Sequence, residues 1–127
     1  MHNHPLDPKL LADAIRQNVA AALAEDIGAG DLSAHLITEN EQAQARVITR
    51  EDGVFCGTAW VEEVFQQFGT PADIRWFVAD GDKVTVDQTL FELRGQARLL
   101  LSTERTILNF VQLLSGTATR TAQYVAQ

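Results

Sequence analysis

Cysteine and long apolar runs are scarce in this chain of 127 residues, and each scarcity excludes a class of protein. The one cysteine, Cys56, excludes a framework of disulfides within the chain and a zinc site built on cysteines. Its place in the apolar run "VFC" is typical of a small buried residue rather than a nucleophile. No stretch reaches the roughly 20 apolar residues that span a bilayer. The first residues also lack the basic-then-apolar pattern of a signal peptide, so we expect a cytoplasmic protein.

Positive charge is scarce as well. Ten Lys and Arg residues stand against 17 Asp and Glu, which gives a formal net charge of −7 without any basic cluster. That balance argues against nucleic acid or an anionic membrane as a partner, so an anionic ligand would need a local site. His2 and His4 stand in the polar stretch "MHNHP", which is typical of a frayed terminus, and no metal site is expected there.

The first expected helix begins at Asp7 and Pro8, because Asp is a good N-cap and Pro suits the first helical position. Apolar residues then recur at helical spacing: Leu11, Ile15, Val19, Ala22 and Leu23. The stretch "EDIGAGD" interrupts this pattern, and residues 28–32 are predicted to form a turn that reverses the chain. With no preceding strand and no lysine, they are a poor candidate for a phosphate-binding loop.

The middle of the chain carries strand signals around one short helix. Residues 43–49, 53–56, 74–78 and 90–93 are predicted strands, and Asp80-Gly81 is typical of a tight turn. Residues 57–68 are predicted to form a helix that Gly69 caps. This order indicates an α+β fold, a small and mostly antiparallel open sandwich with helices packed against it.

The stretch "LSTERTILNFVQLLSGTATRT", residues 101–121, predicts a helix with Ser102 as its N-cap. Arg105 would then fall in the first turn, where the helix dipole disfavours a cation by about 0.3–1 kcal/mol. That penalty vanishes if the helix begins at Ala97 instead. Ser115-Gly116 is predicted to divide the segment into two helical pieces. The second piece lacks a glycine cap and a proline terminator, which suggests a fragment of a longer chain.

Four polar residues follow one stripe of this helix, and their types are unusual for a solvated face: Ser102, Arg105, Asn109 and Gln112. An apolar stripe lies beside it: Leu101, Leu108, Val111 and Leu114. Amides and a hydroxyl around one guanidinium indicate partly buried hydrogen-bonding partners. Arg105 then has two interpretations, a site for a carboxylate or phosphate and a surface ion pair with Glu104 or another acid. The residues alone favour the ion pair slightly.

The same stretch resembles a known family. "LLLSTERTILNFVQLLSGTATRTAQYV" is similar to the segment "LL..ERT.LNF.Q.LSG.AT.T..YV" of quinolinate phosphoribosyltransferase, the carboxylating nicotinate-nucleotide pyrophosphorylase. Upstream, "LAEDIGAGDLSAHLI", "EDGVFCGTAWVEEVF" and "VADGDKVTVDQTLFELRGQARLL" resemble further family segments in the right order. Ser33 stands where the family usually has Thr, and Asp87 where it commonly has Gly.

The resemblance implies a hammerhead-like N-terminal domain over residues 1–115, with residues 116–127 beginning the helix that leads to a barrel absent from this chain. It implies a homodimer or higher oligomer, and an enzyme of NAD biosynthesis. That enzyme converts quinolinate and phosphoribosyl pyrophosphate to nicotinate mononucleotide, carbon dioxide and pyrophosphate, with Mg²⁺ bound outside these residues. Arg105 would bind substrate across the dimer interface, and the 127 residues alone are expected to be inactive.

Three other interpretations stay open. The chain could belong to a relative with the same fold and another substrate, since the barrel would decide substrate choice. The stretch "VADGDKVTVDQTLFELRG" also resembles biotinyl and lipoyl carrier domains, which present a modifiable lysine at a hairpin tip, although the surroundings of Lys83 argue against this. The third interpretation is a domain that only mediates association.

Overall fold

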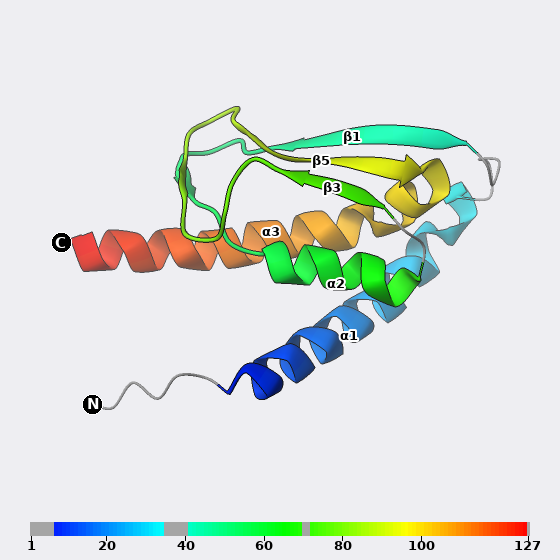
Figure 1. The fold of residues 1–127 in the computed structure, drawn as a ribbon, viewed down its shortest axis with the longest axis horizontal. Helices are drawn as coiled ribbons and strands as arrows, with labels where there is room; N and C mark the ends of the chain where they lie inside the picture. Colours follow the sequence, from blue (N-terminus) through cyan, green and yellow to red (C-terminus); the bar gives the residue numbers. More distant parts are fainter. Residues whose placement is uncertain (1–6, 35–40, 70–71, 127) are drawn as a thin grey trace.

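The computed structural model describes residues 7–34, 41–69 and 72–126 (Figure 1). Helices and strands alternate along these ranges in the order α1 (Pro8–Ala34), β1 (Gln42–Ile48), β2 (Gly53–Val54), α2 (Thr58–Phe68), β3 (Asp73–Trp76), β4 (Lys83–Val84), β5 (Thr89–Gln96) and α3 (Ala97–Ala126). No helix in the described part of the chain has both the length and the apolarity to cross a membrane. His2 and His4 lie outside the described residues.

The strands form two antiparallel sheets. The larger has the order β1-β5-β3, and the smaller pairs β2 with β4. In the larger sheet Val47 lies opposite Phe91 and Ile48 opposite Thr89, so one extra residue, Leu90, interrupts the ladder as a bulge. Strand β1 alternates strictly between exposed and half-buried residues, as expected for a sheet with one covered face.

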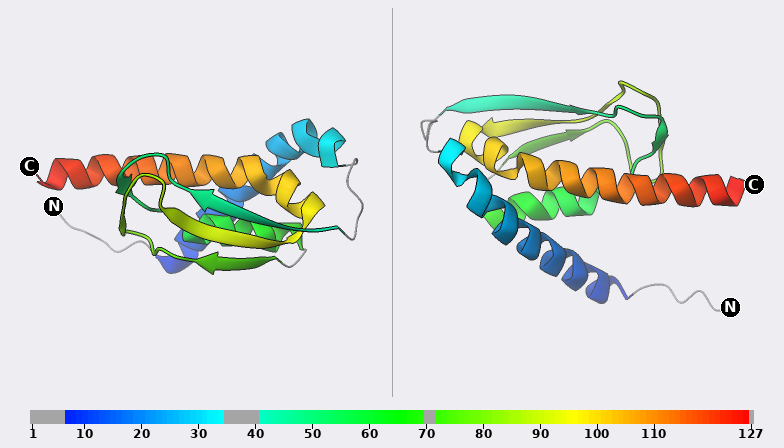
Figure 2. Two further views of the ribbon diagram at one scale, coloured as in Figure 1. Left: turned by 90° about the horizontal axis from the view of Figure 1, so that it is seen from above. Right: turned by 180° about the vertical axis from the view of Figure 1, so that it is seen from behind.

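The helices lie on one side of the larger sheet, as Figures 1 and 2 show, with α2 and α3 next to it and α1 beyond them. The buried core therefore lies between the sheet and this helical layer. Phe91, Val61 and Ile107 are almost fully buried there, and Trp76 packs on Phe91 with 4.7 Å between ring centroids. The antiparallel sheets and segregated helices confirm the predicted α+β open sandwich, and the described residues contain no closed barrel.

Helix α1 confirms the predicted start and corrects the predicted end. The Asp7 side chain accepts a hydrogen bond of 2.9 Å from the Lys9 amide, which is the expected N-cap interaction. Residues 28–32 are helical and not a turn, because α1 continues to Ala34. A helix tolerates an isolated glycine at about 1 kcal/mol, so two glycines among Ala, Asp and Leu need not end it. Leu11 is 39% exposed, although Ile15, Val19 and Leu23 are buried as predicted.

Helix α2 has a capping interaction or conformation at each end. At its start the Asp80 carboxylate accepts hydrogen bonds from the backbone amides of Gly57 and Thr58, at 3.0 and 3.2 Å. Asp80 belongs to the predicted tight turn, so this turn also supplies the helix cap from 22 residues away. At its end Gly69 adopts a left-handed conformation, with φ of 72°, as expected for a C-terminal glycine.

Helix α3 differs from its prediction in two ways. It begins at Ala97, directly after β5, so Ser102 is not the N-cap. It also runs unbroken through Ser115 and Gly116 to Ala126, so the predicted division into two pieces is wrong. Ser115 is helical, and its side chain bonds to the Cys56 amide in the β2 segment, defined as residues 53–56. This bond stabilises the helix at the point where the sequence suggests a break. The boundary at residue 115 between a domain and a connecting helix stays a prediction.

Candidate functional site

Arg105 lies inside α3, eight residues after Ala97 and about 12 Å along the helix axis from it. The electrostatic penalty of a first-turn cation therefore disappears, as the alternative start at Ala97 predicts. The free amides of the first turn are equally remote, so they cannot join Arg105 in binding one anion. The Arg105 side chain is exposed and has no hydrogen bond or ion pair among the described residues. The interpretation as a surface ion pair with Glu104 is not supported.

The rest of the predicted polar stripe is mostly exposed. Asn109 and Gln112 are exposed like Arg105, and only Ser102 is half-buried. The expectation of partly buried partners within the chain is therefore wrong for the three residues that point outward. In the neighbouring apolar stripe Leu101 is 39% exposed, whereas Val111 is buried. The stripe is a free polar face, available to something other than the described part of this chain.

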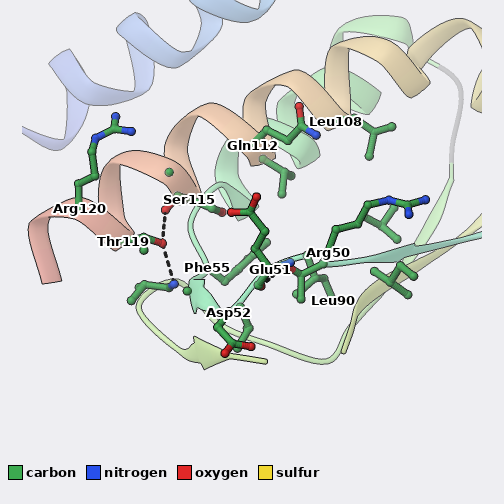
Figure 3. Close-up of a pocket in the computed structure, with 18 of the residues that line it drawn as sticks. Arg50, Glu51, Asp52, Phe55, Leu90, Leu108, Gln112, Ser115, Thr119 and Arg120 are labelled. Carbon is green, nitrogen blue, oxygen red and sulfur yellow. Dashed lines mark hydrogen bonds between the residues drawn. The ribbon is translucent and has the colours of Figure 1, made fainter. Parts of the chain in front are cut away.

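An open groove of about 710 Å³ lies beside the C-terminal end of this stripe, and Gln112 belongs to its lining (Figure 3). Its walls are β1, the connection from β1 to β2, and the second half of α3. Arg46, Arg50 and Arg120 contribute cations to the lining, while Glu51 and Asp52 contribute carboxylates. This mixed charge gives the groove no strong preference for an anion. Arg105 is not among the lining residues, so the predicted substrate-binding residue and the groove are separate features.

Hydroxyl groups of α3 bind the β2 segment at the end of this groove. Thr119 Oγ1 accepts a hydrogen bond of 2.9 Å from the Val54 amide. Ser115 Oγ accepts one of 3.0 Å from the Cys56 amide and donates one of 3.1 Å to the Cys56 carbonyl. On the other edge of the β2 segment, the Phe55 amide donates a hydrogen bond of 2.9 Å to the Asp82 carbonyl. The α3 hydroxyls therefore occupy the place that a further strand would take.

The spacing of the two elements makes this arrangement possible. Residues four apart on a helix are separated by about 6 Å along its axis, and alternate residues of a strand by about 6.6–6.8 Å. Ser115 and Thr119 consequently match Cys56 and Val54. Close approach also requires Gly53, because a Cβ there would lie 2.6 Å from Thr119 Oγ1. These residues are structural, and neither their hydroxyls nor the glycine points to catalysis.

Cys56 is half-buried in this contact, whereas a buried residue was predicted. Burial, and secondarily the negative charge of Asp80, raises the pKa of the Cys56 thiol above its usual value. A raised pKa keeps the thiol protonated at neutral pH and therefore unreactive. The interpretation of Cys56 as a non-nucleophilic residue is supported.

Two other candidate sites can be placed. Lys83 lies in β4, paired with Val54, and not at a hairpin tip, so the lysine of a carrier domain is not supported. Among the described residues, no three His, Cys, Asp or Glu side chains gather in a way that could hold a metal ion. We therefore assign no metal to this part of the chain, and Mg²⁺ stays a prediction about other residues.

One polar contact was not predicted from the sequence. Thr106 is almost fully buried on the face of α3 that meets α1, and its hydroxyl donates a hydrogen bond of 2.7 Å to Asp26. Thr106 follows Arg105 directly and Asp26 belongs to "EDIGAGD", but neither stretch carries a signal for a contact between them. The contact joins residues 80 positions apart, and no local pattern pairs them.

Comparisons with known proteins agree on one family. A family model described as "Quinolinate phosphoribosyl transferase, N-terminal domain" matches residues 31–115. The "Probable nicotinate-nucleotide pyrophosphorylase [carboxylating]" of Bacillus subtilis is 37% identical over 101 residues, which cover 80% of this chain and 35% of that protein. The "Quinolinate phosphoribosyltransferase [decarboxylating] 2b, mitochondrial" of Nicotiana tabacum is 32% identical over 111 residues, covering 86% of this chain and 32% of that protein.

Solved structures give the same result. The nicotinate-nucleotide pyrophosphorylase from Francisella tularensis superposes with a TM-score of 0.85 at 42% sequence identity, over 91% of this chain and 41% of that one. The chain spans about a third of the length of the curated relatives that it matches.

Proposed function

This chain belongs to the family of quinolinate phosphoribosyl transferase N-terminal domains, and from that premise we propose that it works as part of a phosphoribosyltransferase of NAD biosynthesis. The proposed reaction joins quinolinate to phosphoribosyl pyrophosphate and releases carbon dioxide and pyrophosphate. In this proposal the chain is the N-terminal domain, ending near residue 115, and the rest of α3 leads toward a barrel that carries most of the active site. Magnesium would be bound by residues of that barrel.

The specific role proposed for this domain is to supply Arg105 to the active site of a second subunit. Quinolinate carries two carboxylates, and fixed positive charge in a dry site stabilises them far more than the same charge in water. Loss of carbon dioxide leaves electron density on the ring, which a nearby cation would also stabilise. A guanidinium offers two parallel donors to a carboxylate, and it stays protonated, so it binds and orients the acid without acting as a base.

One observation carries this proposal. Arg105 is exposed, has no partner among the described residues and does not line the groove of its own chain. An arginine without a local partner is available to a neighbouring molecule. A homodimer in which this domain faces the partner's barrel would place it there, and a cytoplasmic location is part of the same proposal.

The test uses the complete enzyme that carries this domain. We expect Arg105→Ala to lower kcat/KM for quinolinate by about 10²–10³-fold, the usual effect of removing one fixed donor of charge stabilisation. Arg120→Ala is the matched control, because Arg120 is also an exposed arginine of α3 and lies on the groove instead. Equal effects of the two substitutions would contradict the role of Arg105. The 127 residues alone should form no nicotinate mononucleotide, and detecting that product would also contradict the proposal.

The same enzyme distinguishes the interpretation as a relative with another substrate. If quinolinate is the substrate, the loss caused by Arg105→Ala should be larger for quinolinate than for a pyridine with one carboxylate. Turnover of such a monocarboxylate in preference to quinolinate would favour the relative. Binding of neither acid, with an intact dimer, would favour a domain that only mediates association.

A further inference from the structure

We infer that Asp26 and Thr106 form a positioning pair that fixes the orientation of Arg105 toward its ligand. The inference rests on the proposed function of Arg105 and adds the two residues on which its placement depends. Neither residue would touch the substrate. Their hydrogen bond instead fixes the position and rotation of α3 relative to α1 at the helical turn that carries Arg105.

The contact has the geometry of a strong hydrogen bond. The 2.7 Å between Thr106 Oγ1 and Asp26 Oδ2 is typical of a hydroxyl that donates to a carboxylate, and such bonds are about twice as strong as neutral ones. Thr106 is 1% exposed and Asp26 is half-buried, so little water competes for the hydroxyl. The bond joins α1 to α3 in the part of the fold where Figure 2 shows these two helices crossing.

A second buried threonine on the same helix shows that a buried threonine hydroxyl need not bond to another helix. Thr103 is fully buried as well, and its hydroxyl donates to the Leu99 carbonyl one turn earlier at 2.8 Å. That is the usual way for a helical threonine to satisfy its hydroxyl. Thr106 bonds across to another helix instead. The two residues therefore have the same side chain and the same burial, and only one of them connects two elements.

The connection determines where Arg105 points, because consecutive residues of a helix are about 100° apart around its axis. Fixing Thr106 toward α1 fixes the outward direction of the Arg105 Cα–Cβ bond. Arg105 has no hydrogen bond or ion pair of its own within residues 7–34, 41–69 and 72–126 that could hold it. The position of the Arg105 side chain consequently depends on the position and rotation of α3 relative to α1. Small errors are costly at such a site, since a misplacement of about 1 Å can lower a rate by roughly a hundredfold.

The experiment measures the Kd of quinolinate for the complete enzyme by calorimetry, together with the KM for phosphoribosyl pyrophosphate and the melting temperature. Thr106→Val removes the hydroxyl and keeps the shape, while Thr106→Ser keeps the hydroxyl. Asp26→Ala removes the acceptor from a half-buried helical position, where alanine is well tolerated. Thr103→Val is the matched control, because it removes an equally buried hydroxyl that bonds only within α3.

We expect Thr106→Val and Asp26→Ala each to weaken quinolinate binding about five- to tenfold, and the double variant to be no weaker than the worse single variant. Thr106→Ser should restore binding to within about twofold. Thr103→Val should lower the melting temperature and leave the Kd unchanged. The KM for phosphoribosyl pyrophosphate should change less than twofold in all five variants, because the proposed pair acts through Arg105 alone.

Two results would overturn the inference, and they differ from the failure of the proposed function. If Arg105→Ala weakens quinolinate binding while Thr106→Val and Asp26→Ala do not, the positioning pair is wrong and the role of Arg105 stands. Equal losses of affinity in Thr103→Val and Thr106→Val would show that the contact contributes only to the general stability of the fold. If Arg105→Ala itself leaves the Kd unchanged, both the proposed function and the positioning pair fail.

Discussion

Two sets of polar residues follow α3, and the rest of the domain contacts only one of them. The hydroxyls of Thr106, Ser115 and Thr119 bond to α1 or to the β2 segment. The stripe that contains Arg105 and Asn109 is exposed and makes no such bond within the described residues. Ser115 and Thr119 recur at helical spacing, as the stripe does, and Thr106 lies on the opposite side of the helix. Periodicity alone therefore does not separate the bound residues from the free ones.

The difference shows that the polar residues of one helix can form two groups. One group stabilises the fold, and the other is available to bind another molecule. A small hydroxyl fits inside a packed interface and satisfies backbone groups that would otherwise be buried without a partner. A guanidinium or a long amide is expensive to bury, so it stays on the outside unless a second molecule provides its partners. We therefore expect substitutions on the hydroxyl face that Ser115 and Thr119 form to change stability, and substitution of Arg105 on the exposed stripe to change binding. Thr106 is proposed to affect binding only through the placement of Arg105.

The largest expected effect on stability comes from the closest approach on the hydroxyl face. Gly53→Ala would place a Cβ 2.6 Å from Thr119 Oγ1, so either the Thr119 side chain must rotate and lose its bond to the Val54 amide, or the strand and the helix must separate. We expect the free energy of unfolding of the 127-residue chain to fall by about 2–3 kcal/mol, measured by urea denaturation, as for other overpacked contacts. Thr119→Ala in the same background should recover part of this loss by removing the clash. An unchanged midpoint for Gly53→Ala would show that the contact is looser than described.

A smaller effect is expected at Ser115, whose hydroxyl both accepts from and donates to the backbone of Cys56. Ser115→Ala should lower the free energy of unfolding by about 1–2 kcal/mol, because it leaves a part-buried amide and carbonyl without partners. Thr117→Ala is the control, since Thr117 is exposed and donates to the Leu113 carbonyl of its own helix. Similar losses for the two variants would mean that the bonds to Cys56 contribute nothing specific.

The smallest effect on stability is expected on the exposed stripe. Asn109→Ala and Gln112→Ala should each change the free energy of unfolding by less than about 0.5 kcal/mol, as is usual for exposed positions without a specific partner. Thermal denaturation of the chain measures this directly. A loss above about 1 kcal/mol would show that these amides have structural partners, and the distinction between the two faces of α3 would then fail.

The sequence predicted several elements well because their signals are local. An aspartate before a proline defines the start of α1, and Gly69 ends α2 in the conformation that glycine favours. Asp87 adopts a left-handed conformation with φ of 68°, which glycine favours, at the position where the family resemblance leads us to expect glycine. In each of these examples, the conformation of one or two residues determines the outcome.

The sequence misplaced features whose cause is tertiary. "EDIGAGD" and Ser115-Gly116 contain residues that favour turns, yet both stretches are helical. The helix at Ser115 is stabilised by bonds to Cys56, 59 residues earlier in the chain. The N-cap assigned to Ser102 failed for a related reason, since α3 follows β5 without a loop and the Ala97 amide bonds to the Glu41 carbonyl.

By itself, the sequence determined the α+β class, the antiparallel strands, the family and the identity of Arg105 as the residue of interest. Only the tertiary structure decided which polar residues of α3 are bound within the domain and which are free. The physical reason is that a helix repeats every 3.6 residues whatever surrounds it, so its polar positions can be read from the sequence. Whether each position meets a carboxylate, a strand edge or water depends on segments 59 to 80 residues away.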